Sequence, residues 1–347
     1  MLIANTTKSV RIIVKNEKSG CAYLGSRGNP TTSNYYSLKQ EKIMDNELIL
    51  FDRINVIKDT ITKYGEDNFY LSFSGGKDST ILHHLLDMAL PNNRIPRVFI
   101  DTGIEYQMIR DFVLELAKND DRFVIIKPTQ PIKPMLEKYG YPFKSKEFAH
   151  HYGVFQKSGK TKSVLKFLQQ AESGTNNKLI VCPTLLKPLF EVGNELPFKV
   201  SADCCRKMKK EPAHKYEKES GRTIAITGMR NSEGGQRMSI KGCILTDKNG
   251  NIKRFHPLIK VDDQWEEWLI HTHTIALAKV YCQPLNFKRS GCKFCPFSLD
   301  LQEQLELAYK YMPNEAKQGE IIWKPVFDAY RKLGYRLKNY VKDKLDF

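Results

Sequence analysis

A pair of glycines, Gly75 and Gly76, separates an apolar run from a helical segment. This strand–loop–helix pattern limits the possible folds more than any other part of the sequence. Residues 69–73 are apolar or aromatic and predict a β-strand, and residues 79–90 predict a helix. Glycines allow a tight turn that brings backbone N–H groups to an anion, and the next helix directs its positive end to the same point. The sequence therefore predicts a phosphate-binding loop, which consists of Ser74, Gly75, Gly76, Lys77, Asp78 and Ser79.

Strands and helices continue to alternate after this loop, which is typical of a parallel sheet with helices on both faces. An Asn-Gly pair at positions 249 and 250 predicts the turn of a β-hairpin within residues 240–258. The further predicted strands are 97–100, 123–126 and 223–227, and the predicted helices are 106–117, 132–138, 265–277 and 302–311.

The 347 residues divide into three parts. Residues 1–43 are polar, contain turn signals and predict a poorly ordered extension. Residues 44–260 predict an α/β nucleotide-binding domain, interrupted at 139–200 by a lysine-rich insertion over the sheet edge with one helix near 164–170. Residues 261–347 predict a mainly helical C-terminal part with a Cys-x-x-Cys motif and a basic tail.

The loop differs from a Walker loop, because Leu71 stands where that motif has its first glycine and Asp78 where it has Ser or Thr. It resembles the signature of the PP-loop ATP pyrophosphatases. Residues 101–105, Asp-Thr-Gly-Ile-Glu, resemble a stretch of the phosphoadenosine phosphosulfate (PAPS) reductase family, a branch that includes DNA-phosphorothioation enzymes. The resemblance implies an adenine nucleotide alpha-hydrolase-like, Rossmann-like fold.

Four of the eight cysteines are clustered in the sequence, as an adjacent pair and a distant Cys-x-x-Cys. They are Cys204, Cys205, Cys292 and Cys295. A tetrahedral zinc site, a [4Fe–4S] cluster and unrelated structural roles are open alternatives. Adjacent cysteines suit a cubane better than a single ion, because each can reach a different iron atom. The string Cys-Cys-Arg-x-x-Lys-x-Glu-Pro resembles the cluster-bearing members of the family, in which Lys209 would offset thiolate charge.

The resemblance also implies a set of nucleotide-binding residues. The loop after the strand at 223–227 resembles the arginine-bearing loop of the family, and two arginines there could clamp phosphates. The expected nucleotide-binding residues are Ser74, Gly75, Gly76, Lys77, Asp78, Ser79, Asp101, Thr102, Gly103, Glu105, Arg230 and Arg237.

The chain departs from sulfonucleotide reductases in two places. No cysteine follows Cys295, and the loop keeps Lys77 and Asp78. We therefore expect cleavage of ATP to AMP and pyrophosphate with adenylylation of a substrate, followed by cluster-assisted sulfur transfer from a donor such as a cysteine desulfurase. Lys77, Asp78 and Asp101 are the expected catalytic residues, with Mg²⁺ placed by Asp78 or Asp101. A sulfonucleotide reductase and a nucleic-acid-binding module with a regulatory nucleotide site are the alternatives.

The formal net charge of +16 favours a polyanionic partner, for which DNA or tRNA is our expectation. No apolar run approaches the ~20 residues of a membrane helix and no secretory signal is evident, so we expect a cytoplasmic protein. The expected nucleic-acid footprint consists of Tyr330, Arg331, Lys332, Tyr335, Arg336, Lys338, Tyr340 and Lys342 in the tail and of Lys144, Lys146, Lys157, Lys160, Lys162 and Lys166 in the insertion.

Overall fold

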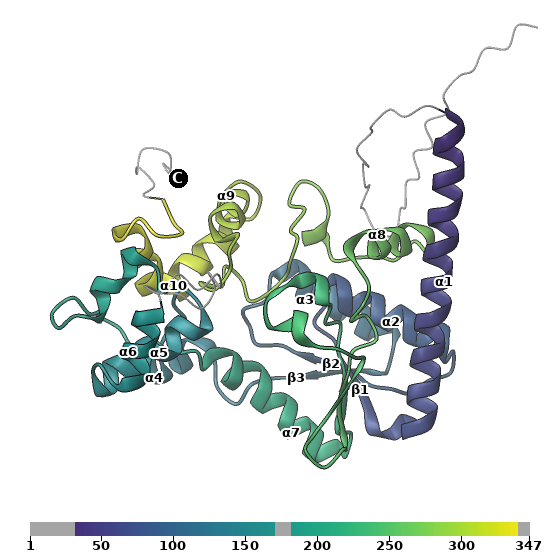
Figure 1. Ribbon diagram of the computed structural model, residues 1–347, viewed down its shortest axis with the longest axis horizontal. Coiled ribbons are helices and arrows are strands. Elements are labelled where there is room, and N and C mark those ends of the chain that lie inside the picture. The colour runs from purple at the N-terminus through teal and green to yellow at the C-terminus, as the bar shows by residue number, and fades with distance from the viewer. Residues whose placement is uncertain (1–31, 171–181, 339–347) are drawn as a thin grey trace, which may run out of the picture.

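A six-stranded sheet lies at the centre of the larger part of the molecule (Figure 1). The computed structural model describes residues 32–170 and 182–338. The strands are short, and those in the interior of the sheet are more buried than those at its two edges. They are β1 (Phe69–Ser72), β2 (Arg97–Ile100), β3 (Phe123–Ile126), β4 (Ile224–Ile226), β5 (Ile244–Thr246) and β6 (Ile252–Phe255).

The order of the strands is β3-β2-β1-β4-β6-β5, with β1 in the interior of the sheet. In this spatial order, each of the four neighbouring pairs β3-β2, β2-β1, β1-β4 and β4-β6 is parallel. The remaining pair, β6-β5, is antiparallel. The predicted hairpin is therefore correct, and Gly250 in its turn has a φ of 82°. The prediction of a Rossmann-like, mainly parallel sheet is confirmed.

Ten α-helices surround the sheet and form the C-terminal part within the described residues. Figure 1 shows α1 along one side of the sheet and α7 on the opposite side from α2. The helices are α1 (Thr32–Tyr64), α2 (Lys77–Ala89), α3 (Gln107–Asn119), α4 (Ile132–Tyr139), α5 (Lys146–Ser158), α6 (Lys162–Gln170), α7 (Glu211–Ser220), α8 (Asp263–Thr272), α9 (Leu301–Tyr311) and α10 (Pro313–Lys332).

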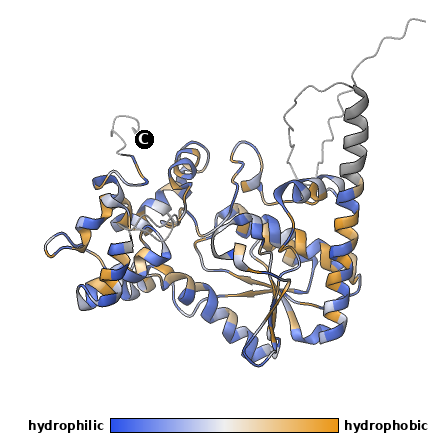
Figure 2. Ribbon diagram, in the orientation of Figure 1, coloured by the Kyte–Doolittle hydropathy of each residue, from blue (hydrophilic) through white to orange (hydrophobic). Residues whose placement is uncertain are grey.

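Alternate residues of the central strands point to two apolar layers of different size. Phe69 and Leu71 belong to the main core, which includes buried residues of α2 and α3. Tyr70 points to the other face, where its ring centroid lies 5.4 Å from that of Tyr216 on α7. Figure 2 shows the apolar colour concentrated along the strands and the inner sides of the helices. The second face is only thinly covered, which leaves room for a cavity.

The lysine-rich insertion forms a helical lobe together with the C-terminal part. The rings of Phe143 and Tyr330 lie 4.8 Å apart, and the backbone N–H of Lys144 donates to the Tyr330 hydroxyl at 2.7 Å. This insertion contains α5 and α6, of which only α6 was predicted. Gly153 within α5 reads as a helix breaker in the sequence, but a Cβ atom there would lie 2.6 Å from the carbonyl oxygen of Val200. The glycine permits a close approach rather than ending the helix.

The expectation of a poorly ordered extension over residues 1–43 is wrong for residues 32–43, which form the start of helix α1. Helix α1 begins at Thr32, whereas residues 1–31 lie outside the described part of the chain. The indole N–H of Trp265 donates to the carbonyl of Asn46 at 3.0 Å, and α1 also packs on α2. Among the described residues, no helix combines the length and apolar character that crossing a membrane would require.

Candidate functional site

The glycine-rich loop connects the carboxyl end of β1 to the start of α2. Gly75 has a φ of 68°, and a Cβ atom there would lie 2.8 Å from side-chain atoms of both Ile109 and Val113 on α3. This position therefore requires glycine both for its backbone conformation and for the close approach of α3. Gly76 precedes the first residue of α2 and provides no side-chain cap. The first N–H groups of this helix thus have no capping side chain and can bind an anion.

Hydroxyl groups hold the loop in this shape. Ser79 donates to the carbonyl of Gly76 at 2.9 Å, and Thr80 donates to the same oxygen at 3.0 Å. The N–H of Gly76 donates to the hydroxyl of Ser74 at 3.2 Å. Ser79 is buried and shapes the loop, whereas Ser74 is exposed and faces two cavities.

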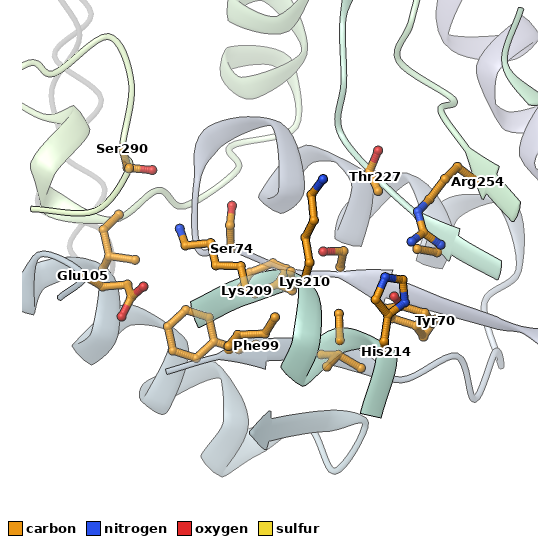
Figure 3. A pocket seen from close by; sticks show the side chains of 18 residues that line it. Tyr70, Ser74, Phe99, Glu105, Lys209, Lys210, His214, Thr227, Arg254 and Ser290 are labelled. Atoms are coloured by element: carbon orange, nitrogen blue, oxygen red, sulfur yellow. The ribbon is translucent and has the colours of Figure 1, made fainter. Parts of the chain in front are cut away.

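The first cavity has a volume of about 400 Å³ and opens between the thinly covered sheet face and the helical turn before α7 (Figure 3). Apolar side chains from the strands and from α3 line part of it, and lysines and a histidine line another part. Such a mixture suits a planar heterocycle with polar substituents. Its lining includes Tyr70, Ser74, Val98, Phe99, Glu105, Ile109, Lys209, Lys210, His214, Ala225, Thr227, Arg254 and Ser290.

The second cavity has a volume of about 540 Å³ and lies at the start of α2. It shares Ser74 and Ser290 with the first cavity, so the loop stands between the two. Its walls are polar and carry cations from three separate segments, which suits a charged ligand. The lining includes Gly76, Lys77, Asp78, Arg230, Ser232, Glu233, Arg237, Asp263, Glu267, Tyr281, Lys288 and Arg289.

Arg230 lies at the centre of an ionic cluster beside the second cavity. Its Nε atom lies 2.8 Å from Asp78 Oδ1 and 3.1 Å from Glu266 Oε1, and its Nη1 atom lies 2.7 Å from Asp263 Oδ1. The Nζ atom of Lys77 lies 3.2 Å from Glu266 Oε2. Burial, with a further contribution from Asp78, raises the pKa of Glu266 to about 8. Three carboxylates therefore already surround the guanidinium expected to clamp phosphates.

Arg237, the second expected clamp, forms an ion pair with Glu233. The Nη2 atom of Arg289 lies 3.8 Å from Glu233 Oε1 and donates to the backbone carbonyl of Glu233 at 3.1 Å. Both arginines are partly exposed and line the second cavity. They could therefore exchange a carboxylate for a phosphate without a rearrangement of the core.

The stretch from Asp101 to Glu105 follows β2, beside the loop. Asp101 is buried, and its carboxylate accepts from Arg110 at 3.0 Å. The N–H and hydroxyl of Thr102 donate to the carboxylate of Glu105 at 3.0 and 2.6 Å, and Gly103 takes a φ of 78°. Glu105 lines the first cavity. Within this stretch the structure therefore places Glu105 at a cavity wall and Asp101 in an ion pair.

The structure brings the four clustered cysteines into one neighbourhood. The hydrogen bond with Cys205 raises the pKa of Cys204, and it lowers the pKa of Cys205 to about 6 with help from nearby lysines. Burial raises the pKa of Cys292 and raises that of Cys295 to about 12, while Lys209 opposes both shifts. No three histidine, cysteine or acidic side chains of the described residues are arranged to hold a metal ion. The sequence predicted that these four cysteines lie close together. Among the described residues, their side chains are not arranged as the ligands of a metal ion.

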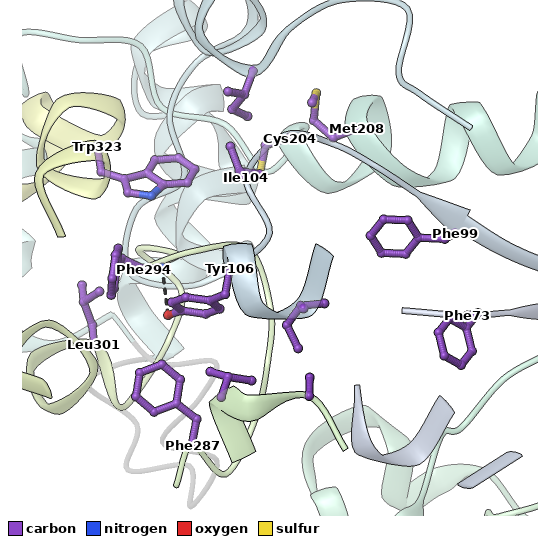
Figure 4. Close-up of a cluster of buried hydrophobic side chains, with 14 of the residues drawn as sticks. Phe73, Phe99, Ile104, Tyr106, Cys204, Met208, Phe287, Phe294, Leu301 and Trp323 are labelled. Atoms are coloured by element: carbon purple, nitrogen blue, oxygen red, sulfur yellow. Dashed lines mark hydrogen bonds between the residues drawn. The ribbon is translucent and has the colours of Figure 1, made fainter. Parts of the chain in front are cut away.

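Backbone contacts connect the cysteines to the stretch after β2. The N–H of Lys293 donates to the carbonyl of Ile104 at 2.6 Å, and the N–H of Phe294 donates to the hydroxyl of Tyr106 at 3.3 Å. Cys204 belongs to the same buried cluster as Ile104 and Tyr106 (Figure 4). The cysteine site and the first cavity are thus built on shared elements.

The expected basic footprint is only partly at the surface. Tyr330 and Lys144 are buried, Arg331 binds Glu320 at 2.9 Å, and Arg336 donates to the carbonyl of Pro296. Tyr330 and Lys144 are therefore not available to a binding surface, and including these two was wrong, whereas Arg331 and Arg336 are partly exposed and make their contacts within the helical lobe. Tyr340 and Lys342 lie outside the described residues. The exposed lysines of the footprint are Lys146, Lys157, Lys160, Lys162, Lys166, Lys332 and Lys338.

Sequence reasoning missed several residues of the site. Glu266 is fully buried beside Lys77, whereas its neighbour Glu267 is exposed, and nothing in the sequence distinguishes the two glutamates. Lys288 and Arg289 stand shortly before Cys292, and their position next to that motif could have identified them.

The sequence profile of the phosphoadenosine phosphosulfate reductase domain matches residues 68–175 and 160–298. These segments span the loop, the stretch after β2 and all four clustered cysteines. The chain belongs to the phosphoadenosine phosphosulfate reductase family. An uncharacterized protein of Methanocaldococcus jannaschii is 37% identical to this family member over 73 residues, which are 21% of the chain and 17% of the relative. The match thus spans under a fifth of that relative's length.

Solved structures resemble this family member at low sequence identity. The PAPS reductase of Candida auris, in a phosphate complex, is 16% identical with a TM-score of 0.37, over 69% of this chain and 93% of that one. The U34-tRNA thiolase NcsA of Methanococcus maripaludis, with its [4Fe–4S] cluster, is 14% identical with a TM-score of 0.35, over 87% and 84%. At these scores the similarity says nothing about the reaction.

Proposed function

We propose that this PAPS reductase family member binds ATP and cleaves it between the α- and β-phosphates, which adenylylates an acceptor. The observation that carries the proposal is the position of the glycine-rich loop, whose Ser74 lines both cavities and whose Lys77, at the start of α2, lines the second. A nucleoside would occupy the cavity on the sheet face, and its phosphates would pass the loop to reach the polar cavity. Uncapped N–H groups and the lysine would stabilise charge on the leaving pyrophosphate.

The other loop residues have supporting roles in this proposal. Ser74 would donate a hydroxyl to the phosphates, while Ser79 keeps the loop in shape. Asp78 would help to place Mg²⁺. The ion would enter together with the triphosphate, because Mg²⁺ is held mainly by phosphate oxygens and water and by few protein ligands. Asp101 is bound to Arg110 and would act by orienting residues 102–105 toward the nucleotide.

A [4Fe–4S] cluster is the cofactor proposed for Cys204, Cys205, Cys292 and Cys295. Four thiols in one neighbourhood with a lysine beside them fit the charge and ligand number of such a cluster, although their present arrangement is not that of a metal site. When bound, the cluster would supply a site for a sulfur species. The cysteines would hold it close to the first cavity, where the adenylated acceptor would lie.

The acceptor that we propose is a nucleic acid, DNA or tRNA, and the sulfur would come from a donor such as a cysteine desulfurase. The net charge of +16 and the exposed lysines of α5 and α6 support a polyanionic partner. A second candidate is reduction of a sulfonucleotide, which the family match favours.

One experiment separates the two candidates. Protein purified without oxygen is incubated with ATP and Mg²⁺, with and without nucleic acid, and pyrophosphate is measured. We expect ATP-dependent pyrophosphate release that nucleic acid stimulates. Thiol-dependent sulfite release from a sulfonucleotide in the absence of ATP would instead identify a reductase.

A further inference from the structure

Thr227 and His256 stand side by side where two neighbouring parallel strands end. Thr227 follows β4 and His256 follows β6, and the last residues of these strands, Ile226 and Phe255, are paired in the sheet. The N–H of Thr227 donates to the carbonyl of Phe255 at 2.9 Å, and the hydroxyl of Thr227 lies 2.6 Å from Nδ1 of His256. The two side chains thus form one hydrogen-bonded pair at the carboxyl edge of the sheet, where such folds bind their ligands.

The two members of this pair differ in exposure. His256 is 1% exposed, and its Nε2 atom has no hydrogen-bond partner among the described residues. Thr227 is partly exposed and lines the first cavity (Figure 3). Within the described part of the chain, the hydroxyl of Thr227 makes no hydrogen bond other than the one with His256. A ligand in that cavity can therefore contact Thr227, and His256 can act on it only through Thr227.

The burial of His256 indicates which ring nitrogen carries the proton. Burial lowers the pKa of His256 to about 4, so the ring is neutral at neutral pH and has a single N–H. Buried N–H groups without an acceptor are rarer than buried acceptors without a donor. Because Nε2 is the nitrogen without a partner, the proton belongs on Nδ1. The backbone of Thr227 opposes the pKa shift, which is the effect of a carbonyl that accepts from a ring N–H.

A proton on Nδ1 sets the role of the Thr227 hydroxyl. The ring N–H then donates to the hydroxyl oxygen, so the single hydrogen of the hydroxyl points away from His256. The space beside Thr227 that can hold an acceptor for this hydrogen is the first cavity. The opposite tautomer would instead direct the hydrogen to Nδ1 and would present only a lone pair to the cavity.

A fixed donor suits a ligand atom that only accepts hydrogen bonds. Phosphate oxygens have this property, whereas the hydroxyls of a ribose both donate and accept. Gly228, the next residue, comes so close to the start of α2 that a Cβ atom there would lie 2.7 Å from Cβ of Asp78. Thr227 is therefore close to the phosphate loop, where the phosphate nearest to the nucleoside would lie.

We propose that Thr227 donates a hydrogen bond to a phosphate oxygen of the nucleotide, and that His256 is the positioning residue that fixes the threonine hydroxyl as a donor. The inference rests on the proposed binding of ATP across the two cavities. The pair adds to that function the recognition of an acceptor oxygen by neutral groups, with no further charge placed in the site.

The role of Thr227 is tested by its effect on the affinity for a non-hydrolysable ATP analogue with Mg²⁺, measured by calorimetry. Thr227→Val has nearly the same shape without the hydroxyl and should weaken binding about tenfold to a hundredfold, the scale of a hydrogen bond to a charged group. Thr227→Ser keeps the hydroxyl and should retain most of the affinity. Thr223→Val, at an exposed position just before β4, is the control and should bind as the wild-type protein does.

The role of His256 is tested by a double-mutant cycle with Thr227. His256→Phe removes the ring N–H and should weaken binding by a smaller factor, because the hydroxyl can still donate but is no longer oriented. In the Thr227→Val background the same replacement should cause no further loss. His256→Asn, whose amide N–H can replace that of Nδ1, should recover the affinity that His256→Phe loses. Losses that add in the double variant would overturn the positioning role, since a merely structural defect does not depend on the Thr227 hydroxyl.

The tautomer is measured independently by NMR of the histidine ring nitrogens in the ligand-free wild-type protein, with the signal of His256 assigned through its contact with Thr227. We expect the proton on Nδ1. A proton on Nε2 would overturn the inference even if the His256 variants do not fold, and so would wild-type affinity in Thr227→Val. A wild-type protein that does not bind the analogue would instead contradict the proposed function, whichever tautomer is found.

Discussion

The hydroxyl of Tyr106 accepts a hydrogen bond from the backbone N–H of Phe294, a residue 188 positions later in the chain. The same hydroxyl donates to Gln304 at 3.2 Å, and Tyr106 is almost fully buried. Since Tyr106 directly follows the stretch at the first cavity and Phe294 lies inside the Cys-x-x-Cys motif, this contact joins the two halves of the site.

Tyr106→Phe should therefore destabilise the protein and loosen the cysteine motif. The N–H of Phe294 would lose its buried partner, which costs about 1–3 kcal/mol of the free energy of unfolding. Urea unfolding measures this loss. Tyr311→Phe, at a half-exposed position, is the control and should change stability by less than about 0.5 kcal/mol. Equal stability of the two variants would show that the contact is dispensable.

Lys77→Ala should reduce pyrophosphate release by at least about a hundredfold, because one charge-stabilising group contributes on this scale. The fold should remain intact, since the side chain lies at a cavity wall. Lys118→Ala removes a lysine that is 70% exposed at the end of α3 and should retain full activity. Undiminished turnover in Lys77→Ala would rule out the role of the loop lysine.

Gly75→Ala and Gly103→Ala separate backbone strain from packing. Both glycines have a positive φ, so both substitutions should cost about 1 kcal/mol of stability through strain. Only at Gly75 would the new Cβ meet other atoms, at 2.8 Å, whereas none lies within 4 Å at Gly103. Gly75→Ala should therefore cost about 1–3 kcal/mol more, as measured by chemical unfolding. Similar losses in both variants would contradict this reading of α3.

Replacing any one of Cys204, Cys205, Cys292 or Cys295 by Ser should lower the iron and sulfide content of protein purified without oxygen. Each thiol would bind one iron of the proposed cluster. Cys243→Ser is the matched control, because Cys243 contacts Arg53 in another part of the chain. Stoichiometric zinc without iron in the wild-type protein would exclude the cluster.

Replacing Lys157, Lys160, Lys162 and Lys166 together by Ala should weaken nucleic-acid binding and reduce its dependence on salt. Each lost phosphate contact should lower the slope of log K against log salt by about 0.7–0.9. These four lysines are exposed on and between α5 and α6, so stability should not change. A wild-type protein that binds neither DNA nor RNA at low salt would indicate a small acceptor.

The sequence predicted those parts of the protein that depend on local patterns. Apolar runs such as 69–73 identified the strands β1 to β4, and the Asn249-Gly250 pair located the hairpin of β5 and β6. The glycine loop was placed correctly because its φ requirement and its position between a strand and a helix are both visible in the residues.

Long-range packing could not be predicted in the same way. Gly153 allows α5 to approach Val200, and Gly319 lies inside α10 at a point where a Cβ atom would overlap the Phe294 ring. Both glycines resemble helix breakers unless the partner is known. From the sequence, Arg230 was expected to be a free phosphate ligand. Its partner Asp78 is distant in the sequence, and its partners Asp263 and Glu266 lie on α8, whose inward face the sequence does not reveal.

The contact between the insertion and α10 has a consequence for synthesis of the chain. Tyr330 leaves the ribosome 186 residues after Lys144, so the insertion emerges long before its partner helix. Until then Phe143 lacks the ring that covers it in the finished protein, and exposed aromatic surface of this kind attracts chaperones and other nascent chains. The last helix thus completes the lobe, and a chain that stops before it leaves an apolar surface open to aggregation.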